Sequence, residues 1–424
     1  MFKVEPKDLF GVGNVTNILG LSEREAAMLA RAPQSFSYKG DGGFDVPGLI
    51  SVVGIDKAVS EFSAAMESRL NSRITGLDYI SYELKRAAWR YTAQDHAAAD
   101  KLAESHSKIE NYGGYNGLHV DPMTDATPFS PGDHPDTEVP APRTTDIRAA
   151  IDQSKGILTE IDQAVREVTA WVSKHVVDFA GEKGWSPLEQ VVGPLVGNWA
   201  ELERAGECFK KAGAASETVA ASLTARNSDL AHTWQGKAAD SYQDFGGRLA
   251  KAMAWEGPIG RISEAVLSAM VDKAMAAIVD LLNYVNKKFK EEIVDQALKF
   301  IRDSAITAAI PGVGWMAAAV RGATKAYNLG MAIFHIYEEV TAMIDKIQEM
   351  IRSAKAVLEV LENPEAAAEK EINQRVDKVK EKVDKADKLA GLGQDIISAG
   401  DITAITRAPK DKYAAATGAE AWAD

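Results

Sequence analysis

The sequence predicts an all-α fold, in which tandem helical hairpins form a four-helix-bundle-like core followed by a C-terminal helical region. Apolar residues recur at steps of three and four along most of the 424 residues, which is the spacing of one buried helix face. Hydrophobic residues make up 46% of the chain but aromatic residues only 7%, and Ala is prominent. This composition favours closely packed helices over strands, which are enriched in β-branched and aromatic residues.

Residues 1–110 are expected to form the first helical hairpin. Ser22 and Glu25 have the spacing of a capping box and predict the start of a short helix. A turn-rich stretch at residues 33–45 then interrupts the pattern. Over residues 59–91 the apolar positions step by three or four without a lapse, which is the strongest helical signal in the chain and predicts the second helix.

Residues 111–143 are rich in Gly, Pro and Asp and lack periodicity, so they are predicted to be a flexible linker. They include His119, Asp121, His134 and Asp136, whose side chains are of the types that bind metals. Such side chains in a linker are usually solvated, and no two His residues share one predicted helix at metal-ligand spacing. We therefore predict neither a metal site nor a cofactor.

Residues 144–257 are expected to form a second helical domain. Apolar residues lie on one face over residues 199–223 and again over residues 238–253. Between these runs Gly236 can take the positive φ that ends a helix, and Trp234 offers a large apolar surface that fixes the turn. The region predicts an antiparallel hairpin with Trp-x-Gly at its tip.

The C-terminal part of the chain divides into three predicted regions. Residues 258–362 are predicted to form an Ala-rich helical domain. Residues 363–390 are predicted to form a heptad helix suited to packing or self-association, and residues 391–424 are predicted to be a loose tail. Within the first of these, residues 305–320 are sixteen residues without a charge, but Pro311 interrupts them. Because a membrane span needs about 20 residues, we favour a buried hairpin there.

The run WQGKAADSY, which starts at Trp234, resembles the WXG superfamily of Esx-type proteins, small helical hairpins exported by actinobacterial and other type VII secretion systems. Tyr91 and Asp95 match the Tyr-x-x-x-acid secretion signal of such proteins, although Tyr79 and Glu83 have the same spacing.

In that family the acidic Tyr motif on one hairpin lies near the Trp-x-Gly turn of a partner hairpin. The resemblance therefore implies a composite secretion signal made of Tyr91, Asp95, Trp234 and Gly236. This sequence carries both hairpins on one chain, so we expect them to dock on each other. An Esx-like partner protein and self-association are the open alternatives.

Several classes of function are disfavoured by composition and pattern. The net charge of −13 argues against a nucleic-acid partner, and a single cysteine, Cys208, excludes an internal disulfide framework. The start of the chain lacks the basic and apolar segments of a cleavable signal peptide. No catalytic constellation stands out, so we predict a protein that is not an enzyme.

The resemblance implies a substrate of a type VII secretion system that is exported folded, with the secretion ATPase and its machinery as partners. Such a protein is cytoplasmic before export and secreted afterwards. Two other readings are a membrane-active or pore-forming effector, which would use residues 265–282 and 305–320, and a cytoplasmic helical scaffold. Contact with a membrane is therefore one of the open alternatives.

Overall fold

The computed structural model describes residues 4–39, 48–92, 120–142, 147–175, 180–293, 296, 315–364, 369–382, 389, 391–409 and 413. Every regular element in this part of the chain is a helix, and an isolated bridge between Val4 and Trp234 is the one β-type feature there. The predicted all-α fold is confirmed.

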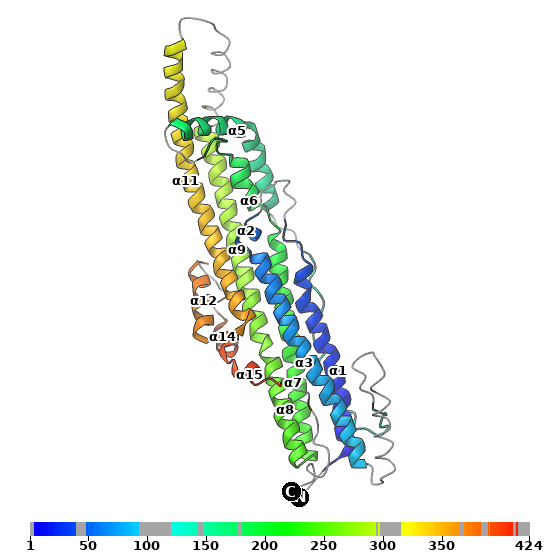
Figure 1. The fold of residues 1–424 in the computed structure, drawn as a ribbon. Helices are drawn as coiled ribbons and strands as arrows, with labels where there is room; N and C mark the ends of the chain where they lie inside the picture. Colours follow the sequence, from blue (N-terminus) through cyan, green and yellow to red (C-terminus); the bar gives the residue numbers. More distant parts are fainter. Residues whose placement is uncertain are drawn as a thin grey trace.

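The helices include several that are long, so the described chain has the shape of an elongated bundle (Figure 1). The first half contains α1 (Pro6–Arg31), the 3-10 helix η1 (Ala32–Ser35), α2 (Leu49–Val53), α3 (Ile55–Thr92), α5 (Ile147–His175), the π-helical turn η3 (Leu188–Val192), α6 (Gly193–Leu195) and α7 (Trp199–Thr233). The second half contains α8 (Lys237–Ala254), α9 (Glu256–Lys288), the π-helical turn η4 (Phe289–Ile293), α11 (Trp315–Glu362), α12 (Glu369–Lys382), α14 (Gly393–Gly400) and α15 (Thr403–Thr406).

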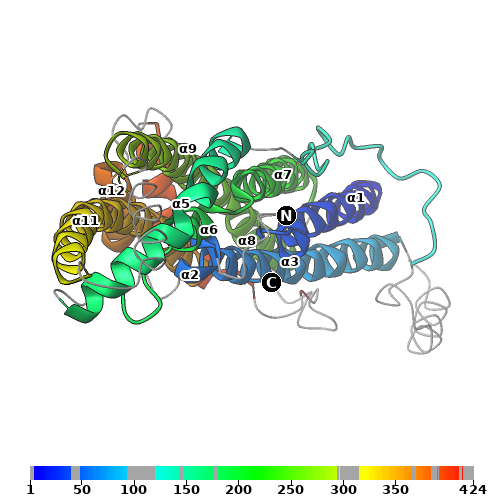
Figure 2. The same ribbon diagram turned by 90° about the horizontal axis from the view of Figure 1, so that it is seen from above.

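Two antiparallel hairpins of one chain pack side by side. α1 pairs with α3, α7 pairs with α8 and α9, and α1 also lies against α7 (Figures 1 and 2). Only Trp255 separates α8 from α9, and its backbone is helical, with φ −64° and ψ −24°. The expected boundary at residue 257 therefore falls in the first turn of α9, and the chain continues into the bundle there.

The start of the first hairpin differs from the prediction. α1 begins at Pro6, a residue that is well suited to the first turn of a helix, and it continues past Ser22, which is buried in its middle. The prediction of a short helix starting at Ser22 is wrong because close packing favours a long helix despite its glycines. A Cβ on Gly11 would lie 2.1 Å from the carbonyl oxygen of Thr127, and one on Gly13 would lie 3.0 Å from that of Ser81.

Buried apolar side chains form two clusters, which we name the tip cluster and the main cluster. The tip cluster holds buried residues up to Leu19 on α1, from Leu77 on α3, from Val219 on α7 and up to Met253 on α8, together with Tyr413. The main cluster holds those from Ala26 on α1, up to Ile74 on α3, up to Ala215 on α7 and from Ile259 on α9, with residues of α5, α11, α12 and α14. Helices α1, α3 and α7 therefore contribute to both clusters, whereas α8 contributes to the tip cluster and α9 to the main cluster.

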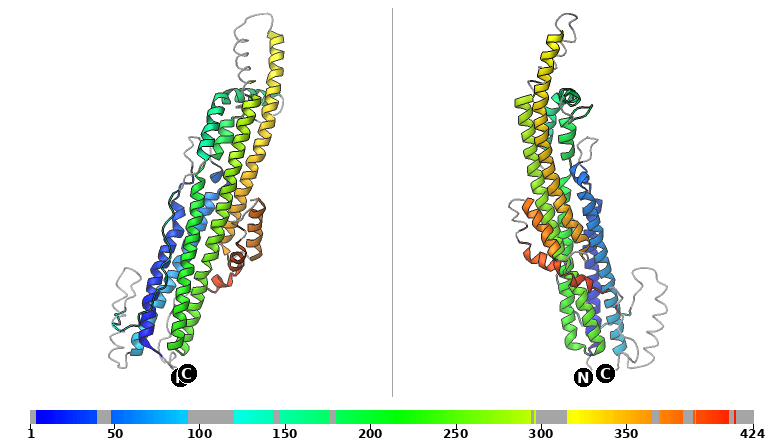
Figure 3. Two further views of the ribbon diagram at one scale, coloured as in Figure 1. Left: turned by 180° about the vertical axis from the view of Figure 1, so that it is seen from behind. Right: turned by 60° about the vertical axis from the view of Figure 1, so that its left-hand side comes forward.

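The predicted loose tail is wrong for residues 391–409. There α14 and α15 form and pack beside α9 and α8 (Figure 3). The Trp255 indole Nε1 donates a hydrogen bond to the Ala399 carbonyl oxygen at 3.0 Å, and Arg261 pairs with Asp395 at 2.8 Å. These contacts come from a distant helix, so the local sequence could not indicate them. The preceding α12 agrees with the predicted heptad helix and buries Ile372, Val376 and Val379.

Residues 120–142 of the predicted linker lie against the helices of the bundle. They contain no helix, but the backbone N–H of Thr127 donates to the Lys7 carbonyl oxygen at 3.1 Å. Arg204 donates to the Pro140 carbonyl oxygen at 2.6 Å. The linker composition predicts the irregular backbone correctly, and the structure adds contacts of that backbone with α1 and α7.

Among the described residues, no helix is long and apolar enough to cross a membrane. Residues 265–282 lie within α9, where most of the apolar side chains are buried. Residues 305–314 lie outside the described part of the chain, and residues 315–320 open α11.

Candidate functional site

The predicted Trp-x-Gly turn forms the tip of the second hairpin. α7 ends at Thr233, and Trp234 has an extended backbone with φ −132° and ψ 122°. Gly236 has φ 112° and ψ 177° and directly precedes Lys237, the first residue of α8. Residues with a side chain rarely adopt such a φ, so the backbone favours Gly here. The chain reverses direction where the sequence predicts it.

Trp234 is an internal anchor, because only 2% of its surface is exposed. Its ring lies 5.6 Å from that of Tyr242, centroid to centroid. The backbone N–H of Glu5 donates to the Thr233 carbonyl oxygen at 3.1 Å, next to the bridge between Trp234 and Val4. The start of α1 is thereby attached to the tip. Residues 235–237 are exposed to solvent at the tip.

Tyr91 lies at the same end of the bundle. It is in the last turn of α3, is half-buried, and packs against the tip cluster, to which Trp234 belongs. Figure 1 shows the end of α3 and the turn between α7 and α8 together at the lower end of the molecule. Asp95 lies outside the described residues. The structure thus brings Tyr91 and Trp234 into one cluster, as docking of the two hairpins requires.

Tyr413 is a part of this site that the sequence analysis missed. Only 4% of its surface is exposed, and its ring centroid lies 6.1 Å from that of Tyr242 and 5.2 Å from that of Phe245. Burial, together with nearby Glu83 and Tyr91, raises the pKa of Tyr413. A single aromatic residue in a stretch without periodicity has no pattern that would reveal this contact.

A second group of polar residues crosses the interior midway along the bundle. This central polar layer consists of Glu23, Arg69, Arg73, Ser216 and Glu256, which come from α1, α3, α7 and α9. Glu256 accepts hydrogen bonds from Arg69 Nε at 2.7 Å, from Arg69 Nη2 at 3.1 Å and from Arg73 Nη2 at 2.7 Å. Glu23 Oε1 accepts one from the Ser216 hydroxyl at 2.8 Å.

The two buried carboxyl groups of this layer have opposite pKa shifts. Burial alone would raise the pKa of Glu256, but Arg69 and Arg73 hold it below its ordinary value. Burial raises the pKa of Glu23 to about 7, against the opposing effects of Arg73 and Ser216. The environment therefore favours an ionised Glu256, whereas Glu23 titrates near neutral pH.

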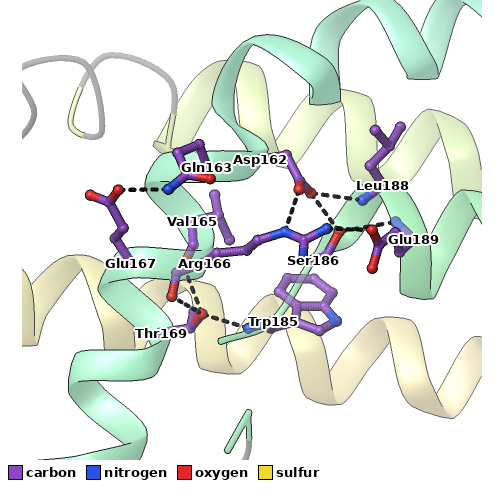
Figure 4. A network of polar contacts seen from close by, with 10 residues as sticks. All are labelled: Asp162, Gln163, Val165, Arg166, Glu167, Thr169, Trp185, Ser186, Leu188 and Glu189. Atoms are coloured by element: carbon purple, nitrogen blue, oxygen red, sulfur yellow. Dashed lines mark hydrogen bonds and ion pairs between the residues drawn. The ribbon is translucent and has the colours of Figure 1, made fainter. Parts of the chain in front are cut away.

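A third polar network lies between α5 and the segment that leads into η3 (Figure 4). Asp162 accepts hydrogen bonds from Arg166 at 2.7 Å and from the Ser186 hydroxyl at 2.8 Å. Ser186 in turn accepts the backbone N–H of Glu189 at 3.1 Å, and Glu189 pairs with Arg166 at 2.7 Å. Each of these groups bonds another protein group, so the network holds the segment on α5.

The described residues include no group of three or more His, Cys, Asp or Glu side chains that could hold a metal ion. Burial raises the pKa of the Cys208 thiol to about 12, which disfavours the reactive thiolate. Comparison with protein-family models, curated proteins and solved structures finds no match to this chain.

Proposed function

We propose that this chain is a non-enzymatic substrate of a type VII secretion system, exported folded and recognised at the end of the bundle that carries the Trp-x-Gly turn. The observation that carries the proposal is the packing of Tyr91 and Trp234 into one cluster although they belong to different hairpins. A signal made of two hairpins needs this proximity. One chain supplies it here without a second protein.

In this proposal the four signal residues have different tasks. Trp234 is buried, so it fixes the shape of the turn, and the exposed backbone around Gly236 is available to the secretion ATPase. Tyr91 and Asp95 supply the acidic Tyr motif beside it. The partner is the export machinery, and a separate Esx-like protein is not required. The protein is cytoplasmic before export and secreted afterwards.

Export of variants tests the proposal. Tyr91→Ala and Asp95→Ala are expected to reduce the amount of protein in the culture supernatant of the source bacterium, as deletion of the secretion ATPase does. Tyr79→Ala is the matched control, since Tyr79 also precedes an acidic residue by four positions and packs against the tip cluster. Each Tyr substitution is expected to reduce stability by about 1 kcal/mol, the typical effect of a point mutation.

Normal export of a folded Tyr91→Ala variant would contradict the role of this motif. Equal losses for Tyr79→Ala and Tyr91→Ala would mean that the cluster matters only for folding. Cysteines placed at Tyr91 and at the exposed Gln235, which spares the positive φ of Gly236, test the geometry separately in a Cys208→Ala background. A short crosslinker should join them within one chain, and exclusively intermolecular products would argue against a signal built in cis.

A further inference from the structure

The central polar layer lies where the tip cluster gives way to the main cluster. Each of the four helices contributes one buried residue at this level, Glu23 from α1, Arg73 from α3, Ser216 from α7 and Glu256 from α9. On either side of the layer the two hairpins meet through apolar side chains. At the layer itself they meet through charges that water does not reach.

The two carboxylates of the layer are satisfied to very different degrees. Glu256 has two Arg partners and accepts three hydrogen bonds. Within the part of the chain that the structure describes, Glu23 accepts a bond only at Oε1, from Ser216. Its Oε2 is buried without a partner, and so is Nη1 of Arg73. A buried carboxylate with one oxygen unpaired retains much of its desolvation cost.

We infer that Glu23 is a protonation switch that controls how tightly α1 packs on α3, α7 and α9. The neutral acid suits this position because it has no charge to desolvate and still bonds Ser216. The ionised form puts a charge where one carboxylate oxygen has no hydrogen-bond donor, and the attraction of Arg73 offsets only part of that desolvation cost. Loss of the proton therefore loosens the contact of α1 with the layer while the ion pairs of Glu256 remain.

The groups that face Glu23 come from three neighbouring helices. Burial has the largest effect on its pKa and raises it. From α3, the positive charge of Arg73 lowers the pKa, and from α7 the hydrogen bond of the uncharged Ser216 also lowers it. From α9, the negative charge of Glu256 raises it. These effects leave the pKa of Glu23 at about 7, so small changes in pH near neutrality alter the charge of α1.

The direction of the pH effect follows from the pKa of about 7 in the folded state and the ordinary value of 4.5 in the unfolded chain. Between these values the folded protein binds more protons than the unfolded chain, so its stability falls as pH rises. The contribution of protonated Glu23 is fully present below about pH 4.5 and is lost as the pH rises through about 7. The unfolding equilibrium constant then increases by at most roughly 300-fold, since each pKa unit is a factor of ten.

Hydrogen exchange of the intact protein, followed by mass spectrometry, locates the effect. Exchange is measured at about pH 6 and pH 8.5, corrected for the intrinsic exchange rates, and compared between peptides of α1 and peptides of α11. Wild-type α1 should lose protection at the higher pH by more than α11 does. Glu23→Gln, which is neutral and nearly isosteric, should keep α1 equally protected at both values.

Glu61→Gln is the matched control, because Glu61 is an exposed carboxylate on α3 that pairs with Lys57. It should retain the wild-type pH response. The inference is overturned if wild-type α1 shows no loss of protection beyond that of α11. It is overturned equally if Glu23→Gln responds to pH as the wild type does.

Infrared spectroscopy of the wild-type protein gives a test that does not depend on whether a variant folds. At about pH 6 ordinary Glu and Asp side chains are ionised, so a buried neutral Glu23 should give a carboxylic-acid C=O band. This band should disappear as the pH is raised to about 8.5 and should be absent from folded Glu23→Gln. A wild-type protein without such a band would refute the switch.

Discussion

Replacing Glu256 by Gln is expected to destabilise the bundle strongly. The Glu256 side chain is fully buried, and its single carboxylate pairs with two guanidinium groups, those of Arg69 and Arg73. Gln keeps the shape of the side chain but removes the one carboxylate that bonds both guanidinium groups. Breaking a buried ion pair by removing one partner costs about 3–5 kcal/mol. Arg69 also donates to the Glu362 carbonyl oxygen at 3.3 Å, so the effect should extend to the end of α11.

Urea unfolding followed by circular dichroism at about pH 7 measures this cost. The control is Glu61→Gln, which removes one exposed carboxylate and should cost no more than about 0.5 kcal/mol. A triple variant, with Met at positions 69, 73 and 256, should be more stable than Glu256→Gln, since apolar residues often replace a buried ion cluster at no net cost. A loss below about 1 kcal/mol for Glu256→Gln would refute the assignment of Glu256 as the counter-ion of both Arg residues.

Glu256 also predicts a response to acid that is opposite to that of Glu23. Because Arg69 and Arg73 hold the folded-state pKa of Glu256 below its ordinary value despite burial, the folded protein binds fewer protons at this site than the unfolded chain. The stability from Glu256 is present above the ordinary pKa of 4.5 and is lost as the pH falls through the lowered folded-state value. Together the two groups place the most stable form of the layer in mildly acidic solution, below the pKa of Glu23.

Two further predictions concern the turn after α5 and the C-terminal segment. Gly184→Ala should destabilise the protein more than Gly181→Ala in thermal unfolding. Both glycines have a positive φ, which costs about 1–2 kcal/mol for other residues, but only a Cβ at Gly184 meets backbone, 2.0 Å from the Arg166 carbonyl oxygen. Tyr413→Ala should cost about 3 kcal/mol of packing and speed tryptic cleavage after Arg407. Tyr413→Phe should leave cleavage unchanged, because the buried Tyr413 hydroxyl has no partner among the described residues.

Long amphipathic helices and the turn between them could be predicted from the sequence because their determinants are local. The apolar steps over residues 59–91 correspond closely to α3 (Ile55–Thr92), and those over residues 238–253 correspond to α8. Trp234 and Gly236 predict a turn through their own chemistry, the large apolar indole and the backbone freedom of Gly. The expected docking of the two hairpins comes from the family resemblance, and it agrees with packing, since a lone hairpin leaves part of its apolar surface uncovered.

Other parts of the fold depend on contacts between distant segments, and the local pattern is silent about them. The start of α1 is stabilised by the Thr127 region and by the bond from Glu5 to Thr233. The segment after residue 390 packs on α9, where Arg261 pairs with Asp395. Tyr413 occupies the tip cluster for a similar reason. Composition suggests that such segments are loose, and packing against a preformed surface overrides that tendency.

The central polar layer could be predicted from the sequence only in part. Arg73 follows Leu70 by three positions and precedes Leu77 by four, so it occupies the apolar face of α3, and its burial could have been inferred. A charge buried on such a face requires an opposite charge on another element. The sequence cannot select that partner, because the chain has 61 acidic residues and Glu256 lies 183 positions away. Only the alignment of α3 with α9 identifies it, and the packing of α1 on these helices places Glu23 near Arg73 while its Oε2 has no hydrogen-bond partner among the described residues.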